Sequence, residues 1–184
     1  MTVDQRELPP IVDVVPLNEA GALDEFDSGD SDLNDFIRQS AKGYESRRLA
    51  RTYVCLQDGR PVGYYSLCAD AIRLSKAERL ESFGKAKPHA EYPAAKIARL
   101  AVDKRKQGTG LGRRLVQHAV GQSLAVSATI GCRFVTVDAY PAATAFYAKL
   151  GFQLNQNEPA KPQNASLRLD IERFQEGSSA VKTP

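Results

Sequence analysis

Apolar positions change their spacing within the first fifty residues. The run IVDVV at 11–15 ends at Pro16 and predicts a first strand. The residues at 29–31 (Gly-Asp-Ser) supply a turn and a helix N-cap. After them the apolar positions fall on one helical face: Leu33, Phe36, Ile37 and Tyr44. This segment therefore predicts a strand followed by a helix.

The middle of the chain reads as a hairpin, a short helix and a further strand. β-rich runs at 52–57 and 61–67 flank Asp58-Gly59, which is a strong hairpin signal. Residues 75–82 predict a short helix, and AKIARLAVD at 95–103 predicts the next strand.

The last third alternates between helix and strand. A helix is expected from Gly110 to about Ile130 with Gly131 as its cap, and a strand at 133–139. Pro141 suits the first turn of the next helix, and Gly151 suits its end. The final strands are expected at 152–156 and 165–171, around a polar loop that holds Pro159 and Pro162. With no repeat or linker, we expect a single α/β domain over 1–174 and a flexible tail over 175–184.

Composition narrows the class of protein. With 42% hydrophobic and 26% charged residues, the 184-residue chain has the balance of a soluble globular domain. It has no apolar run of membrane-spanning length and no signal-peptide core, so a cytoplasmic protein is expected. Three scattered cysteines and two separated histidines disfavour a disulfide framework, a metal site and a histidine triad.

Charge is distributed unevenly along the chain. Residues 1–35 carry ten acidic side chains and one basic side chain. A basic cluster lies further on: Lys96, Arg99, Lys104, Arg105, Lys106, Arg113 and Arg114. Such a run is either a solvated face or a surface for ligands that carry phosphate.

The segment KRKQGTGLGRRL at 104–115 holds three alternating glycines at the start of a predicted helix. A helix N-terminus offers unpaired N–H groups and partial positive charge, and glycines let a phosphate approach closely. The alternative is a flexible turn with a solvated basic face. The segment lacks the Lys-Ser/Thr of a P-loop and the GxGxxG spacing of a dinucleotide site.

Two motifs together resemble the GNAT N-acetyltransferase superfamily. Gln107-x-x-Gly110-x-Gly112 follows the strand ARLAVD and is similar to that family's pyrophosphate-binding segment. VDAYPAATAFYAKLGF at 137–152 is similar to the family's last motif block. The resemblance implies an α/β (α+β) GNAT fold: a mixed, mostly antiparallel sheet of six to seven strands, splayed centrally, with helices on both faces.

The same resemblance implies acetyl-CoA as cosubstrate, with no metal. In the family, the strand before the glycines pairs with pantetheine through its backbone, and the glycine segment receives the pyrophosphate. The residues that carry this over are Leu100, Ala101, Val102, Gln107, Gly108, Thr109, Gly110, Leu111, Gly112, Arg113 and, near the thioester, Phe146.

Tyr147 is the candidate catalytic acid, since a phenol can protonate the leaving thiolate. Helical spacing predicts that the buried face of this helix, next to Tyr147, consists of Ala142, Ala145, Phe146 and Leu150. The alternative is an amphipathic tyrosine at the edge of the core. Glu91 precedes the strand at 95–103, but its spacing does not identify it as a base, so the base stays open.

A narrower resemblance concerns the acceptor. In order, FDSGDSDLNDFI, DGRPVGYYSL, IARLAVDKRKQGTGLGRRLV and the 129–152 block are similar to the GNAT toxins of bacterial toxin–antitoxin pairs. Such toxins acetylate aminoacyl-tRNA and are held inactive by a ribbon-helix-helix antitoxin. A second basic group could contact RNA or be a solvated helix end: Lys42, Arg47, Arg48 and Arg51. The alternatives are an acetyltransferase of a small or protein amine, and a non-catalytic binding module. A homodimer is compatible with the sequence.

Overall fold

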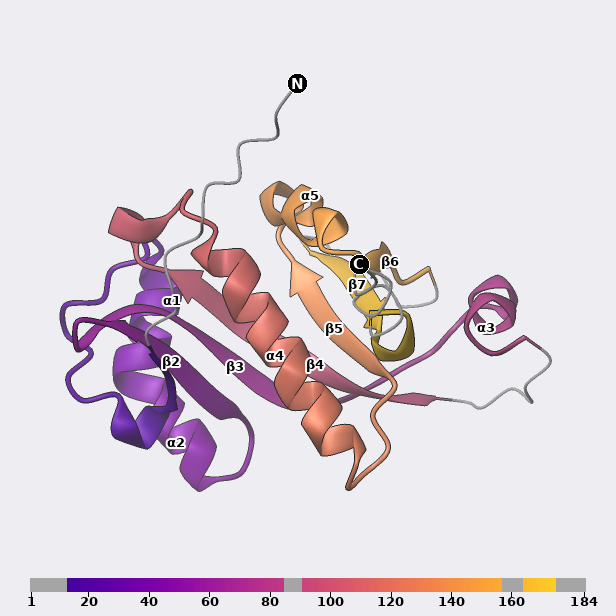
Figure 1. Ribbon diagram of the computed structural model, residues 1–184, viewed down its shortest axis with the longest axis horizontal. Coiled ribbons are helices and arrows are strands. Elements are labelled where there is room, and N and C mark those ends of the chain that lie inside the picture. The colour runs from indigo at the N-terminus through magenta and orange to yellow at the C-terminus, as the bar shows by residue number, and fades with distance from the viewer. Residues whose placement is uncertain (1–12, 85–90, 157–163, 175–184) are drawn as a thin grey trace, which may run out of the picture. The chain divides into compact units, whose positions relative to one another are not determined.

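The computed structural model describes residues 13–84, 91–156 and 164–174. The expected loop with Pro159 and Pro162 and the expected tail lie outside the described residues. In chain order the elements are β1 (Asp13–Pro16), a 3-10 turn (Leu17–Glu19), α1 (Ser31–Asp35), a π turn (Phe36–Ser40), α2 (Ala41–Ser46), β2 (Arg51–Gln57), β3 (Arg60–Ile72), α3 (Lys76–Phe83), β4 (Tyr92–Val102), a 3-10 turn (Lys104–Lys106), α4 (Leu111–Ser127), β5 (Phe134–Ala139), α5 (Pro141–Lys149), β6 (Gln153–Leu154) and β7 (Ala165–Asp170) (Figure 1).

The strands form one seven-stranded sheet in the order β1-β2-β3-β4-β5-β7-β6. β4 and β5 are parallel, whereas β1–β2, β2–β3, β5–β7 and β6–β7 are antiparallel. The parallel ladder joins Ala94–Ile97 to Phe134–Val137, although β4 continues to Val102 and β5 to Ala139. The expected mixed, mostly antiparallel GNAT sheet with a central splay is confirmed.

By its internal contacts the chain divides into two compact units. The first comprises Met1–Leu67 and Arg99–His118, and the second comprises Cys68–Ala98 and Ala119–Pro184. The single domain expected over residues 1–174 stays a prediction. The two units are described separately below.

In the first unit, β3 presents different side chains to its two faces. Tyr64 faces α1, where its hydroxyl donates a hydrogen bond to the Leu33 carbonyl at 2.7 Å. Gly63 points the opposite way, so a Cβ there would lie 2.8 Å from the Leu115 side chain of α4. The ribbon shows α1 and the start of α4 on opposite faces of these strands (Figure 1). Asp58 and Gly59 both have positive φ, as a two-residue type I′ hairpin turn requires, and the predicted hairpin is confirmed.

In the second unit, α5 packs on β5 and β7, and α3 begins with a reciprocal cap. The Ser75 side chain accepts the Glu78 N–H, and the Glu78 carboxylate accepts the Ser75 N–H. Pro141 occupies the first turn of α5, and Gly151 follows its end with φ of +92°. The predicted positions of Pro141 and Gly151 at the two ends of α5 are confirmed.

Two helix predictions were wrong in detail. α4 ends at Ser127 instead of continuing to a Gly131 cap, because tight turns replace the α-helical bonds there. The Ser127 hydroxyl donates to the Leu124 carbonyl at 2.6 Å, a side-chain bond that competes with the helix. The helix predicted from residue 31 contains a π turn, and Tyr44 beyond it contacts the Phe36 ring at a centroid distance of 5.4 Å while remaining 43% exposed.

Candidate active site

The loop between β4 and α4 depends on glycine at two positions. Gly108 has φ of +76° and Gly110 has φ of +84°, a region that residues with a Cβ avoid. Gly112 lies inside the first turn of α4 and has no positive φ. The backbone conformation therefore explains Gly108 and Gly110 and does not explain Gly112.

Asp103 anchors this loop, and its side chain is completely buried. The guanidinium of Arg105 donates to both carboxylate oxygens at 2.8 Å, and the N–H groups of Arg105 and Asp27 donate at 2.9 and 3.1 Å. The hydrogen bonds from Arg105 lower the pKa of Asp103 to about 2. The sequence interpretation missed this residue, although an acid directly ahead of three cations was an available signal.

The acidic N-terminal segment supplies the partner of a second loop cation. The backbone N–H of Lys104 donates to the Asp27 carbonyl at 2.8 Å, and its ammonium lies 2.6 Å from the Asp27 carboxylate. That hydrogen bond from Lys104 holds the pKa of Asp27 far below its ordinary value. Lys104 and Arg105 are therefore neutralised within the chain, which leaves them poorly suited to be the main phosphate ligands.

Gln107 uses its side chain to hold the loop. Its Nε2 donates to the carbonyls of Ser28 and Val102 at 2.9 and 3.1 Å. Both side-chain donors therefore have partners inside the protein. In this arrangement the Gln107 amide positions the loop backbone, and contact with a ligand would have to come from the backbone itself.

The start of α4 retains the groups that bind anions. The first intrahelical bond runs from the Arg114 N–H to the Gly110 carbonyl, so the N–H groups of Leu111, Gly112 and Arg113 precede the helical ladder. This helix of 17 residues adds partial positive charge at that end. Within the described part of the chain, no carboxylate lies within salt-bridge distance of Lys106 or Arg113. The loop and its two cations thus fit a pyrophosphate.

The end of β4 carries the residues expected to pair with pantetheine. Ala101 is buried, while Leu100 and Val102 are half-buried. Beside them, a Cβ on Gly63 would lie 3.2 Å from the Ala101 carbonyl oxygen as well as colliding with Leu115. Gly63 therefore lets β3 and α4 pack closely at the strand end. The sequence interpretation missed this position because a glycine inside a strand gives no sign of what it faces.

Tyr147 is the most buried residue of α5, with 5% of its surface exposed. Its ring makes edge-to-face contacts with Phe146 and Phe152, at centroid distances of 5.0 and 5.4 Å. Burial raises the pKa of Tyr147 to about 12, so the phenol keeps its proton throughout the neutral range. Among the residues that the structure describes, none hydrogen-bonds the hydroxyl.

The expected core stripe of α5 was wrong. Ala142 and Ala145 are exposed, Phe146 and Leu150 are half-buried, and Tyr147 takes the inward position. The reason is that α5 is turned about its own axis by about one residue, so that a neighbouring face of the helix, and not the predicted one, packs against β5 and β7. Leu100 to Arg113 lie together in the first unit, and Phe146 and Tyr147 lie together in the second.

Glu91, the acid considered as a base, is exposed and ion-paired. Its carboxylate lies 3.5 Å from the Arg73 guanidinium. The ion pair with Arg73 does not identify Glu91 as a base, and the base stays unassigned.

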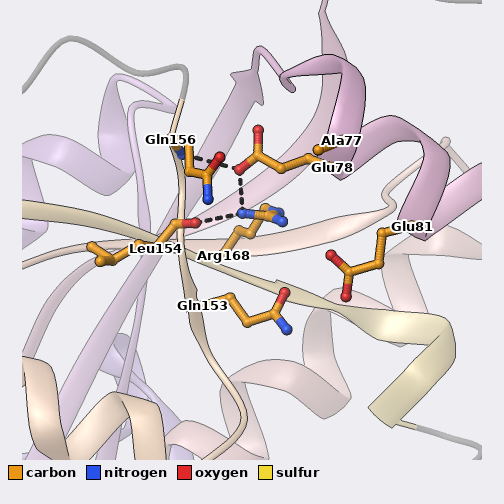
Figure 2. Close-up of a pocket in the computed structure, with 7 residues that line it drawn as sticks. All are labelled: Ala77, Glu78, Glu81, Gln153, Leu154, Gln156 and Arg168. Carbon is orange, nitrogen blue, oxygen red and sulfur yellow. Dashed lines mark hydrogen bonds and ion pairs between the residues drawn. The ribbon is translucent and has the colours of Figure 1, made fainter.

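A pocket of about 250 Å³ lies elsewhere in the second unit, between α3 and the β6–β7 edge (Figure 2). At its floor Arg168 Nη1 donates at 2.6 Å to both the Glu78 carboxylate and the Leu154 carbonyl. The same Glu78 carboxylate accepts the Gln156 N–H at 3.0 Å. Burial by itself raises the pKa of Glu78, but the hydrogen bonds from Gln156 and Ser75 outweigh it and the pKa is lowered. None of the predicted site residues lines this pocket, and its ion pair joins α3 to the strands.

The described ranges contain no group of three His, Cys, Asp or Glu side chains that could hold a metal ion. They also contain no helix long and apolar enough to cross a membrane. Cys55, Cys68 and Cys132 are free thiols.

Comparison with known proteins places this geometry in a family. Residues 48–154 match the family described as "Acetyltransferase (GNAT) domain". A tRNA-acetylating toxin of Mycobacterium tuberculosis is 31% identical over 144 residues, which is 78% of this chain and 85% of the relative.

Solved structures agree with that assignment at the level of the fold. AtaT complexed with acetyl-methionyl-tRNAfMet has a TM-score of 0.76 and 23% identity, over 90% of this chain and 97% of that one. A tyrosine-to-phenylalanine mutant of the AtaT toxin has a TM-score of 0.75 and 25% identity, over 90% and 93% of the two chains. The family match covers more than half of the chain, the sheet has the expected splay, and the chain is therefore a member of the GNAT acetyltransferase family.

Proposed function

We propose that this enzyme transfers the acetyl group of acetyl-CoA to the α-amine of aminoacyl-tRNA, and that it acts as a toxin that blocks translation. The observation that carries the acceptor is the 31% identity to a tRNA-acetylating toxin over 78% of the chain. The similarity to AtaT, solved in a complex with acetyl-methionyl-tRNAfMet, supports the same acceptor class.

In this proposal the first unit binds the cosubstrate. The pyrophosphate binds the N–H groups at the start of α4 with help from Lys106 and Arg113, and Gly108 and Gly110 shape the loop. Leu100, Ala101 and Val102 pair with pantetheine through their backbone. Gln107, Asp103 and Asp27 hold the loop in place. Thr109, Leu111 and Gly112 complete the cradle. Phe146, in the second unit, stays an expectation that rests on the resemblance to the family.

The chemistry is attack of a neutral amine on the thioester carbonyl. A C–N bond forms, the C–S bond breaks, the amine loses one proton and the departing thiolate gains one. Tyr147 supplies the thiolate's proton, since its pKa of about 12 keeps the hydroxyl protonated at neutral pH. No described residue competes for that hydroxyl.

Tyr147→Phe tests this role. The phenyl ring keeps the contacts with Phe146 and Phe152, so folding and acetyl-CoA affinity are expected to be unchanged. The turnover number is expected to fall by roughly 10²- to 10³-fold, the usual contribution of a general acid. Tyr140→Phe is the control, because Tyr140 caps the N-terminus of α5 and is 52% exposed. Normal turnover of the Tyr147 variant would remove the proposed role.

The acceptor is tested directly with labelled acetyl-CoA. Charged tRNA, uncharged tRNA, polyamines and peptides are each incubated with the enzyme, and the acetylated product is identified. Only charged tRNA is expected to accept the label on its aminoacyl group. Labelling of a polyamine or peptide without any labelling of charged tRNA would replace the toxin assignment with a small-amine or protein acetyltransferase.

The proposal includes a cytoplasmic location, where charged tRNA is available, and an antitoxin partner. AtaT has been solved bound to the C-terminus of the antitoxin AtaR and acetyl-CoA. A KacTA–DNA complex is also among the structural relatives, with a TM-score of 0.70. For this chain we propose a ribbon-helix-helix antitoxin and a homodimer. Growth arrest on expression that a co-encoded antitoxin relieves is the cellular test.

A further inference from the structure

The turn that ends α2 holds an arginine in the left-handed backbone conformation. Arg48 has φ of +58°. Its N–H donates to the Glu45 carbonyl at 2.9 Å, and the Leu49 N–H donates to the Tyr44 carbonyl at 2.9 Å. These are the two bonds of a Schellman cap, whose left-handed position is usually glycine. A side chain at that position disfavours the turn, so the fold alone does not call for arginine.

One other non-glycine residue of the described chain shares this conformation, and it differs in kind. Asp58 has φ of +52° in the β2–β3 hairpin. Aspartate tolerates left-handed φ because its short carboxylate can hydrogen-bond the local backbone. Arginine has no such local compensation. The helix dipole does not explain Arg48 either, because Arg47 already places a cation at the same helix end in an ordinary conformation.

The side chains around Arg48 leave a net positive surface. Lys42, Arg47 and Arg48 are exposed. In the described residues no carboxylate lies within salt-bridge distance of these three. Arg51 has a loose pair, with its Nε 3.8 Å from the Glu45 carboxylate and its side chain 57% exposed. We call these four cations the α2-end cluster; in the described part of the chain, the Glu45 carboxylate is the one acid within salt-bridge distance of any of them.

That acid is directed inward. The Glu45 side chain is 13% exposed and its carboxylate accepts the Thr52 N–H at 2.8 Å. The contrast with the glycine loop of the same unit is clear, since Lys104 and Arg105 there are each paired with a carboxylate at 2.8 Å or less. The α2-end cluster thus keeps the positive charge that the loop has lost to internal pairs.

We propose that the α2-end cluster binds the phosphate backbone of the RNA acceptor. Exposed arginines and lysines that lack internal carboxylates gain most from phosphate contacts, which release counterions from the RNA. Arginine adds a planar fork of donors that suits a phosphate. Arg48 is exposed at this turn and so places a charged side chain on the surface, whereas glycine, which the backbone favours there, would place none. This inference rests on the proposed function.

Arg48→Gly separates the fold from the surface. Glycine suits φ of +58°, so the melting temperature is expected to stay the same or rise. The dissociation constant for charged tRNA is expected to rise about 5- to 10-fold. The slope of log affinity against log salt concentration is expected to become shallower by about 0.7 to 0.9, the value of one lost phosphate contact. The KM for acetyl-CoA and the turnover number at saturating tRNA are expected to be unchanged.

Two control variants isolate backbone and charge. Asp58→Gly makes the same substitution at the other left-handed residue and is expected to leave the salt slope alone. Arg60→Ala removes another exposed cation of the first unit, whose side chain is 69% exposed and 4.0 Å from the Glu25 carboxylate, and is expected to change tRNA affinity little. Lys42→Ala with Arg47→Ala is expected to add to the loss caused by Arg48→Gly.

The outcomes distinguish this inference from the proposed function. If the wild-type enzyme does not acetylate charged tRNA, the proposed function fails. If it does, and Arg48→Gly keeps both the wild-type affinity and the wild-type salt slope, the cluster does not bind RNA and the inference is overturned. Weakened binding of an antitoxin with unchanged tRNA binding would also overturn it, and would assign the surface to a protein.

Discussion

Asp103→Asn removes one negative charge from the completely buried anchor of the glycine loop. The carboxylate accepts four N–H groups, three of them from Arg105 and one from Asp27. An amide has one acceptor oxygen, so its NH₂ group would face a donor where a carboxylate oxygen accepted before. Arg105 would keep its charge but lose its partner, at modest cost because its side chain is 53% exposed.

The size of the effect follows from the pKa of Asp103. That pKa falls from 3.8 to about 2 in the folded protein, and each unit corresponds to about 1.4 kcal/mol. The carboxylate therefore stabilises the folded state at neutral pH by about 2 kcal/mol. Because the folded pKa is the lower one, this contribution is complete above pH 4 and is lost as the pH falls from 4 toward 2.

Urea unfolding at several pH values measures both parts of the prediction. At pH 7 the free energy of unfolding of Asp103→Asn is expected to be about 2 kcal/mol lower than that of the wild type, with an unchanged m-value. Between pH 4 and pH 2 the two proteins are expected to converge. Asp24→Asn, at an exposed aspartate of the same unit, is the control.

A difference in the free energy of unfolding that stays constant from pH 7 to pH 2.5 would refute the electrostatic reasoning. It would mean that the shape of the Asp103 side chain, and not its charge, stabilises the fold. The KM for acetyl-CoA is expected to rise in the variant, since the loop loses the group that fixes its first turn.

Three further predictions concern the loop and the second unit. Gln107→Ala is expected to raise the KM for acetyl-CoA about tenfold with little change in turnover, because the two carbonyls that it holds lose their donor; steady-state kinetics measure this. Gly110→Ala is expected to lower the free energy of unfolding by about 1–2 kcal/mol, because φ at this position is +84°. Gly121→Ala within α4 is the matched control: a Cβ there meets nothing, so the free energy of unfolding is expected to rise by up to about 1 kcal/mol. Glu78→Gln is expected to lower the free energy of unfolding by about 3–5 kcal/mol, because it leaves the charge of the buried Arg168 unpaired. Since folding lowers the pKa of Glu78, the difference in the free energy of unfolding between variant and wild type is expected to narrow in acid.

Local features of the fold could be predicted because each depends on a few neighbouring residues. The hairpin at Asp58-Gly59 and the short helix predicted over 75–82 appear where the sequence places them. The glycine motif also indicated its loop correctly, since positive φ at Gly108 and Gly110 is a property of the residue itself. The end of α4 was missed, because a serine bond and tight turns near Ser127 outweighed a glycine four residues later.

The sequence by itself determined the family motif, the order of strands and helices, and the tyrosine on α5. Only the tertiary structure decided how the loop is held and that Lys104 is neutralised, because the partners lie far apart in the chain. Lys104 pairs with the distant Asp27, and hydrogen bonds join Asp27 to Asp103 across 76 positions and Gln107 to Ser28 across 79. Spacing along the chain reports on helical and strand periods, but a carboxylate that neutralises a distant cation leaves no periodic trace. For this reason the sequence did not separate Lys104, which the distant Asp27 neutralises, from Lys106, which has no carboxylate within salt-bridge distance in the described part of the chain. Arg105 differs, since its partner Asp103 lies only two residues away.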